Sequence, residues 1–179
     1  DDEHAGEMLF HRRAAAFLVD NERGKRLILR AGNRTMTVGP SHRNGHFTGS
    51  VRLSLDEADP LSRPDKFGRR WIELEVVMPD SDKRRFSAKT VLVEPAGLSV
   101  ISDIDDTIKI TEVTDHEAMI DNTFLRPYRS VPGMTELYQQ WAQRGAVIHF
   151  VSASPWQLYE PLTEFMGMEG FPAATFHLK

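Results

Sequence analysis

Three carboxylates lie within four residues at the end of an apolar run. Residues 98–102 are typical of a buried strand, and Asp103, Asp105 and Asp106 follow it directly. Carboxylates at the mouth of a buried strand repel one another and resist the loss of water, so folding alone gives no reason to gather them. A cation could neutralise them, and a reaction could use them.

A second polar segment follows a second apolar run. Residues 146–151 are nearly all apolar and predict a strand buried in a parallel sheet, with Ser152 directly after it. Residues 132–145 predict a helix that connects the two strands. Strand, helix and strand form a right-handed unit, and ligands of such sheets bind at the carboxyl ends of the strands. Asp103 and Ser152 are therefore expected at the same edge.

Ser154 and Pro155 predict the start of another helix, with Ser154 as its N-cap. A helix N-terminus favours a phosphate, and carboxylates with a divalent cation beside a phosphate suit phosphoryl transfer. In this interpretation Asp103 is the nucleophile that forms an aspartyl-phosphate. Asp105 is the acid and base, and Mg²⁺ is held by Asp103 and Asp105.

These residues resemble a known family. The string DIDDT, residues 103–107, is similar to the first motif of haloacid dehalogenase-type phosphatases. The longer strings DIDDTIKITEV and FVSASPWQLYEPL resemble the actin-patch type phosphatidate phosphatases, with close matching over residues 91–165. The resemblance implies Mg²⁺-dependent hydrolysis of phosphatidate to diacylglycerol and phosphate. It also implies Asp103 as nucleophile, Asp105 as acid and base, and Thr107, Ser152 and Ala153 as phosphate-binding residues.

The sequence departs from that pattern in one respect. The superfamily also uses a third-motif lysine or arginine and a fourth-motif acidic group that completes the Mg²⁺ site, and neither is found before the chain ends at Lys179. Lys179 lies too near a predicted strand over residues 174–178 to serve as the third-motif lysine. The sequence analysis therefore expects half of an active site, truncated after the second motif.

Short strands separated by turns predict a different architecture before residue 96. Strands are expected over residues 16–19, 27–29, 35–38, 47–55, 72–78 and 86–93, after an irregular segment over residues 1–12 and with a polar loop over residues 56–70. The predicted fold class is α/β: a small antiparallel β-sandwich or barrel over residues 1–95. The first half of a haloacid dehalogenase-like doubly wound parallel sheet follows over residues 96–179.

Composition restricts the class of partner. The net charge of −4 shows no general nucleic-acid footprint, and the chain has no cysteine, which excludes disulfides and thiolate metal sites. No apolar run approaches the roughly 18 residues that a transmembrane helix needs. The expected location is cytoplasmic, with peripheral membrane contact at most.

Three functions stay open at this point. The first is a phosphatidate phosphatase, the second a related phosphatase that acts on a soluble phosphoester, and the third a non-catalytic fragment whose β domain is a binding module. Simple structural roles compete with catalytic ones at several positions. Asp106 is expected to be solvated or capping, Lys109 to face solvent or reach a phosphate, and His149 to be packed. Residues 83–85 are expected in a solvated turn that could meet anionic lipid.

Overall fold

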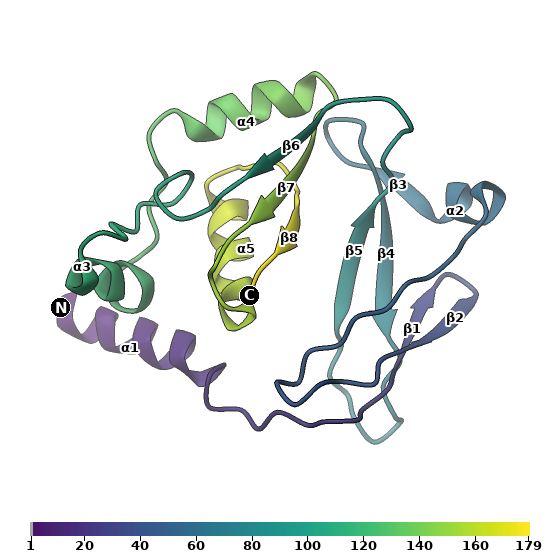
Figure 1. Cartoon of the computed structure of the whole chain (residues 1–179), viewed down its shortest axis with the longest axis horizontal. Coiled ribbons are helices and arrows are strands. Elements are labelled where there is room, and N and C mark those ends of the chain that lie inside the picture. The colour runs from purple at the N-terminus through teal and green to yellow at the C-terminus, as the bar shows by residue number, and fades with distance from the viewer. Residues whose placement is uncertain (1) are drawn as a thin grey trace. The chain divides into compact units, whose positions relative to one another are not determined.

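A computed structural model describes residues 2–179, which form two compact units (Figure 1). Residues 20–95 form the first, which we call the β module. The second, the motif unit, joins residues 96–179 to the N-terminal segment that ends at Val19. The predicted division placed this segment with the β module, whereas it packs with the residues that carry the motifs. The functional domain boundaries 1–95 and 96–179 stay a prediction.

The N-terminal segment forms helix α1 (Asp2–Ala15), where the sequence analysis expected irregular chain. The expected strand over residues 16–19 is also wrong, because these residues form a turn after the helix. The cause is tertiary. Arg13 is 4% exposed and donates to the main-chain oxygens of Thr123 at 2.9 Å and Arg126 at 2.8 Å. These acceptors lie more than a hundred residues away, so local sequence patterns do not reveal them.

The β module is built on one five-stranded antiparallel sheet. Its central strand β4 (Arg70–Val76) pairs along one edge with β5 (Ser87–Val91). Along the other edge it pairs with β3 (Ser62–Pro64) at its start and β1 (Leu27–Ala31) at its end, and β1 pairs with β2 (Arg34–Val38). The mixed α/β class is confirmed. All five strands belong to this sheet, so in the described residues they do not build the second layer of a sandwich.

The expected strand over residues 47–55 is wrong. Residues 47–54 form no strand, and helix α2 (Leu55–Leu61) begins where the strand was expected to end. Ser54 accepts from the Glu57 amide at 3.3 Å, and the Glu57 carboxylate accepts from the Ser54 amide at 2.9 Å. This capping box satisfies two main-chain donors at once and so favours a helix despite the alternating pattern before it. The Ser-x-x-Glu signal was present in the sequence.

The motif unit contains the predicted strand–helix–strand arrangement. Strands β6 (Ser99–Ser102), β7 (Val147–Val151) and β8 (Thr175–His177) form a parallel sheet in that order. Helix α4 (Met134–Gln143) connects β6 to β7, and α5 (Tyr159–Met168) connects β7 to β8. His149 is packed as expected, with its Nδ1 hydrogen-bonded to Thr175 Oγ1 at 2.7 Å. The parallel sheet is confirmed, while the full haloacid dehalogenase-like arrangement stays a prediction.

Residues 108–131 form the irregular excursion between β6 and α4, which we call the flap. It contains the short helix α3 (His116–Ile120) and a π-helical turn over Asp121–Leu125. Helix α1 packs against this turn, and Phe124 contacts the rings of Phe10 and Phe17. The flap is therefore held between the parallel sheet and α1.

The core of the motif unit predicts a large effect for one α5 substitution. Leu162 is fully buried, so Leu162→Ala should lower the free energy of unfolding by about 2–5 kcal/mol, because it removes apolar burial and leaves a cavity. Met168 in the same helix is 75% exposed, so Met168→Ala is the matched control, with a change of less than about 0.5 kcal/mol. Urea denaturation monitors both. Equal midpoints for the two variants would contradict the packing described here.

Candidate active site

The acidic stretch is anchored by the two isoleucines that alternate with its polar residues. Ile104 and Ile108 are fully buried in the core of the motif unit. The Ile104 main-chain oxygen accepts from the amides of Thr107 (3.3 Å), Ile108 (2.9 Å) and Lys109 (3.0 Å), which closes a tight loop. Burial of the isoleucines fixes the directions of the side chains between them. The loop is therefore held by its apolar residues, and its carboxylates are left for other contacts.

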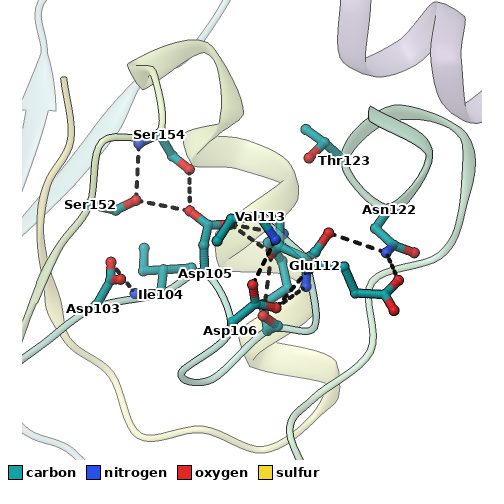
Figure 2. Close-up of polar contacts among 12 residues, drawn as sticks. Asp103, Ile104, Asp105, Asp106, Glu112, Val113, Asn122, Thr123, Ser152 and Ser154 are labelled. Atoms are coloured by element: carbon teal, nitrogen blue, oxygen red, sulfur yellow. Dashed lines mark hydrogen bonds and ion pairs between the residues drawn. The ribbon is translucent and has the colours of Figure 1, made fainter. Parts of the chain in front are cut away.

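The ends of β6 and β7 bring the predicted residues to one edge of the sheet. Ser102 lies opposite Phe150 in the register of the two parallel strands, so Asp103 and Ser152 both follow at the same edge of the sheet. Figure 2 shows the Asp105 side chain beside Ser152 and Ser154, with Asp103 on the same loop. The two motifs meet at the carboxyl ends of the strands, as the sequence predicted.

Both carboxylate oxygens of Asp105 are occupied by donors (Figure 2). Oδ2 accepts from the hydroxyls of Ser152 at 3.1 Å and Ser154 at 2.8 Å. Oδ1 accepts from the Thr111 hydroxyl at 2.8 Å and lies 3.0 Å from the Lys109 ammonium. Four donors from two segments of the chain, residues 109–111 and 152–154, thus fix the orientation of a single carboxylate.

Lys109 is buried, so the expectation that it faces solvent, one of the two given for it, is wrong. The residue is 2% exposed, and its ammonium donates to Thr111 Oγ1 at 2.5 Å in addition to its contact with Asp105. Its Nζ also lies 4.9 Å from the centre of the Tyr128 ring, a cation–π distance. Burial lowers the pKa of Lys109, while the Asp105 carboxylate opposes this shift.

The pKa of Asp105 is lowered by the balance of two opposing effects. Burial raises the pKa, because it penalises the charged carboxylate. The charge of Lys109 and the hydrogen bonds from Thr111, Lys109 and Ser154 lower it and together outweigh burial. In the free protein Asp105 is therefore an ionised carboxylate at neutral pH, ready to accept a proton.

Asp106 has the capping role expected of it. Its φ of +56° turns the side chain away from Asp105 and toward the flap. Oδ1 accepts from the amides of Thr111 and Glu112, both at 2.7 Å, and Oδ2 accepts from the Val113 amide at 2.8 Å. Three main-chain donors on one carboxylate lower its pKa although burial opposes the shift. Asp106 thus connects the loop over residues 103–109 to the start of the flap.

Asp103 is the least constrained of the three carboxylates. It is exposed, and its Oδ1 accepts from the Ile104 amide at 2.8 Å. Among residues 2–179 the Asp103 side chain forms no other hydrogen bond or ion pair. Its Oδ2 atom is therefore free to meet an electrophile or a cation, in clear contrast with the saturated carboxylate of Asp105.

The other predicted phosphate-binding residues have different environments. Thr107 is half-buried and donates its amide within the loop, and Ala153 is exposed between the two serines. Ser154 is not the N-cap that was expected, since its hydroxyl donates to Asp105. A short 3-10 turn over Trp156–Leu158 comes first, and α5 begins only at Tyr159. The expected helix N-terminus therefore starts further from Ser152 than the sequence indicated.

Sequence reasoning missed several residues that support Asp105. Thr111 bridges Lys109 and Asp105, and although it lies in the string DIDDTIKITEV it was given no role. Arg13 lies outside both motif strings, yet its guanidinium carbon is 3.8 Å from the centre of the Tyr128 ring that Lys109 also contacts. Lys109 directly follows Ile108 and lies five residues after Ile104, both of which are buried. This position alone does not distinguish a buried lysine from an exposed one.

The residues fit a divalent cation only as partial ligands. Asp103 offers a free carboxylate oxygen, whereas Asp105 would contribute through its main-chain carbonyl because its carboxylate is saturated. Within residues 2–179 there is no group of three His, Asp or Glu side chains that could hold a metal ion. Mg²⁺ commonly binds through one or two carboxylates together with waters and substrate phosphate oxygens, so this donor set suits it.

Comparison with known proteins relates this site to a family. The model described as "Phosphatidate phosphatase APP1, catalytic domain" matches residues 98–179, the segment from β6 to the end of the chain. This segment is therefore similar to that catalytic-domain family. The match covers Asp103, Asp105, Lys109, Ser152 and the whole flap. The haloacid dehalogenase-like superfamily is consistent with this placement.

One relative extends the similarity beyond the motif unit. An uncharacterized protein of Schizosaccharomyces pombe is 29% identical over 123 residues, which cover 66% of this chain. That share exceeds the matched family segment, so part of the similarity lies before residue 98. The chain spans about a fifth of the length of this relative (20%).

The Asp106 contacts predict a specific local effect. Asp106→Asn keeps one acceptor oxygen but places an amide donor opposite the Val113 amide, so this charge-assisted hydrogen bond is lost. We expect hydrogen exchange at the Val113 amide to accelerate about tenfold or more, measured by NMR. Asp115→Asn is the matched control, because asparagine caps α3 about as well as aspartate. Unchanged exchange at residues 111–113 would contradict the role given to Asp106.

Removal of Lys109 predicts a change in acid stability. A carboxylate whose pKa is lowered by folding adds stability above its ordinary pKa of 3.8, and this contribution is lost as the pH falls through the folded value. In Lys109→Met burial of Asp105 is less opposed, so its pKa rises and acid unfolding begins at higher pH. The loss of one partner should also cost about 3–5 kcal/mol at neutral pH. Urea titrations across the acid range test both effects, and an unaltered acid limb would refute the coupling.

Proposed function

We propose that the motif unit hydrolyses phosphomonoesters through an aspartyl-phosphate on Asp103. One observation carries the proposal: an exposed carboxylate with a free oxygen lies beside a second carboxylate held ionised by four donors. Paired carboxylates in unlike environments are suited to separate roles, one as nucleophile and one as acid and base. The family match to a phosphatidate phosphatase catalytic domain supports phosphatidate as the substrate.

The first half of the proposed reaction transfers the phosphoryl group to the protein. Asp103 Oδ2 attacks phosphorus, and the bond from phosphorus to the diacylglycerol oxygen breaks. Asp105 supplies the proton that the leaving oxygen takes. The lowered pKa of free Asp105 opposes this step, but an approaching phosphate dianion raises the pKa of a nearby carboxyl. Substrate binding would therefore help to load the acid.

The second half returns the protein to its starting state. Asp105 accepts a proton from water, whose oxygen attacks phosphorus and breaks the bond to Asp103, which releases inorganic phosphate. The lowered pKa keeps Asp105 ionised and so available to accept this proton, although it also makes the carboxylate a weaker base. Its fixed orientation contributes more, because the two serine hydroxyls hold the acceptor oxygen in place.

The other residues would hold the phosphate and the cation. Ser152 and the exposed main chain at Ala153 lie at the end of β7 beside Asp105, which suits them to contact phosphate oxygens, and Thr107 supports the loop. Asp103 and the Asp105 carbonyl are the proposed Mg²⁺ ligands. When bound, Mg²⁺ would offset the repulsion between the Asp103 carboxylate and the phosphate oxygens.

Phosphate release from phosphatidate-containing micelles with Mg²⁺ tests the proposal. Asp103→Asn should reduce the rate by at least about a thousandfold, because the nucleophile is lost. Asp105→Asn should reduce the rate by about 10²–10⁴-fold, since positioned proton transfer is lost. Asp20→Asn, in the β module, is the matched control and should leave the rate unchanged.

The outcomes separate the competing functions. Release that survives Asp103→Asn would eliminate Asp103 as nucleophile. Release from small phosphoesters but not from phosphatidate would indicate a soluble substrate. Because the curated relative is much longer, the assay is run on this chain and on the full reading frame that contains it. No release from either would favour a binding role for the β module.

A further inference from the structure

The two units carry charges of opposite sign. Residues 20–95 contain 15 Lys and Arg against 11 Asp and Glu, a net charge of +4. The remaining residues contain 7 Lys and Arg against 15 Asp and Glu, a net charge of −8. The overall charge of −4 therefore conceals a basic β module. Charge asymmetry of this kind indicates a partner that is recognised by one unit.

The hydrogen bonds bring three basic segments to one end of the β sheet. The Val77 amide donates to the Ile28 oxygen, which places the β4–β5 connection beside the chain that enters β1. The Ser41 amide donates to the Lys25 oxygen and the Gly24 amide to the Ser41 oxygen, which adds the loop after β2. We call this end the basic edge. Its cations are Arg23, Lys25, Arg26, Arg43 and the run over residues 83–85.

Five of the seven cations at the basic edge form no ion pair within residues 2–179, whereas four of the eight elsewhere in the module are paired. Arg30, Arg34, Arg69 and Arg70 each form an ion pair with a carboxylate of the same module. At the basic edge Lys25 pairs with Glu22 and Arg84 with Asp82. Within residues 2–179 the other arginines there, Arg23, Arg26, Arg43 and Arg85, form no ion pair, and all four are exposed.

Apolar side chains lie among these arginines. Phe86, at the end of the β4–β5 connection, is 45% exposed, and the adjacent Ile28 and Val77 are 45% and 36% exposed. Phe47, in the loop after β2, is 37% exposed. A pocket of about 620 Å³ opens at the same edge, lined by Arg23, Arg43, His42 and Thr48. Arginines interleaved with aliphatic and aromatic groups suit a partner whose surface is both anionic and apolar.

We propose that the basic edge docks the β module onto an anionic lipid bilayer. The unpaired arginines meet lipid headgroups, and Phe47, Phe86 and Val77 enter the boundary between headgroups and acyl chains. Exposed aliphatic groups favour a bilayer over a nucleic acid, because Ile28 and Val77 cannot stack on bases. The choice of a bilayer also rests on the proposed function, since phosphatidate is itself an anionic membrane lipid.

Vesicle sedimentation with the whole 179-residue chain tests the proposal without any need for turnover. The probes are vesicles of phosphatidylcholine alone and of phosphatidylcholine mixed with phosphatidylserine, at low and high salt. Phosphatidylserine is not a phosphomonoester, so its binding is independent of the proposed chemistry. We expect binding to the mixed vesicles, weak binding to the neutral ones, and a decrease of binding as salt screens the charges.

A matched pair of double variants locates the surface. Arg23→Gln with Arg43→Gln should weaken binding roughly thirtyfold, at about 1 kcal/mol for each cation near an anionic surface. Arg63→Gln with Lys66→Gln removes the same charge at the opposite end of β4 and should change binding less than about twofold. Circular dichroism confirms that both variants fold. The wild-type salt dependence remains a test if either does not.

Three outcomes would overturn the proposal. Equal losses in the two double variants would show attraction by net charge without a defined surface. Tight binding to duplex DNA with no vesicle binding would assign the basic edge to nucleic acid. No binding to mixed vesicles would leave it without a lipid partner. Vesicle binding without phosphate release would retain the docking surface and remove the proposed function, and the reverse result would do the opposite.

Discussion

The buried pair of Asp105 and Lys109 is the constraint on which the motif unit depends. A carboxylate withdrawn from water at the end of a parallel strand is costly unless a cation and hydrogen bonds compensate it. Lys109 supplies that charge from four residues along the same loop, and Thr111 connects the two. The loop over residues 103–109 thus carries its own counter-charge for Asp105.

This arrangement explains why the flap and α1 belong to the same unit. Lys109 can be buried only if something covers it, and the Tyr128 ring from the flap does so. Tyr128 in turn contacts Arg13 of α1, whose guanidinium also holds two flap carbonyls. Asp106 fastens the other end of the flap through three amides. A chain of contacts therefore runs from the N-terminal helix to the Asp105 carboxylate.

The β module follows a different principle. Its core is small, and its buried apolar residues are Ala31, Val38, Ala58, Trp71 and Ile72. The capping box of α2 adds local order. Five of the seven cations at the basic edge form no ion pair within residues 2–179. The net charge of +4 distinguishes the β module from the acidic motif unit.

The sequence by itself determined the elements whose signals are local. Apolar runs predicted β6 and β7, the helical face over residues 134–142 predicted α4, and the motif strings identified the family and placed Asp103 and Ser152 at one edge. Short runs between turn residues predicted β1, β2 and β5, and alternation predicted β4. The same alternation over residues 47–55 was misleading because the Ser54–Glu57 capping box outweighed it.

Only the tertiary structure decided which polar residues support the site. The sequence of Lys109, Thr111, Ser154 and Arg13 does not show their roles, because a lysine or a serine reads the same in the sequence whether it is buried or exposed. Ser154 and Arg13 act through contacts 49 and more than a hundred residues apart, and the burial of Lys109 depends on the Tyr128 ring of the flap. Compensation of a buried charge is a property of the space around it, and that space exists only after the sheet, the flap and α1 have packed together.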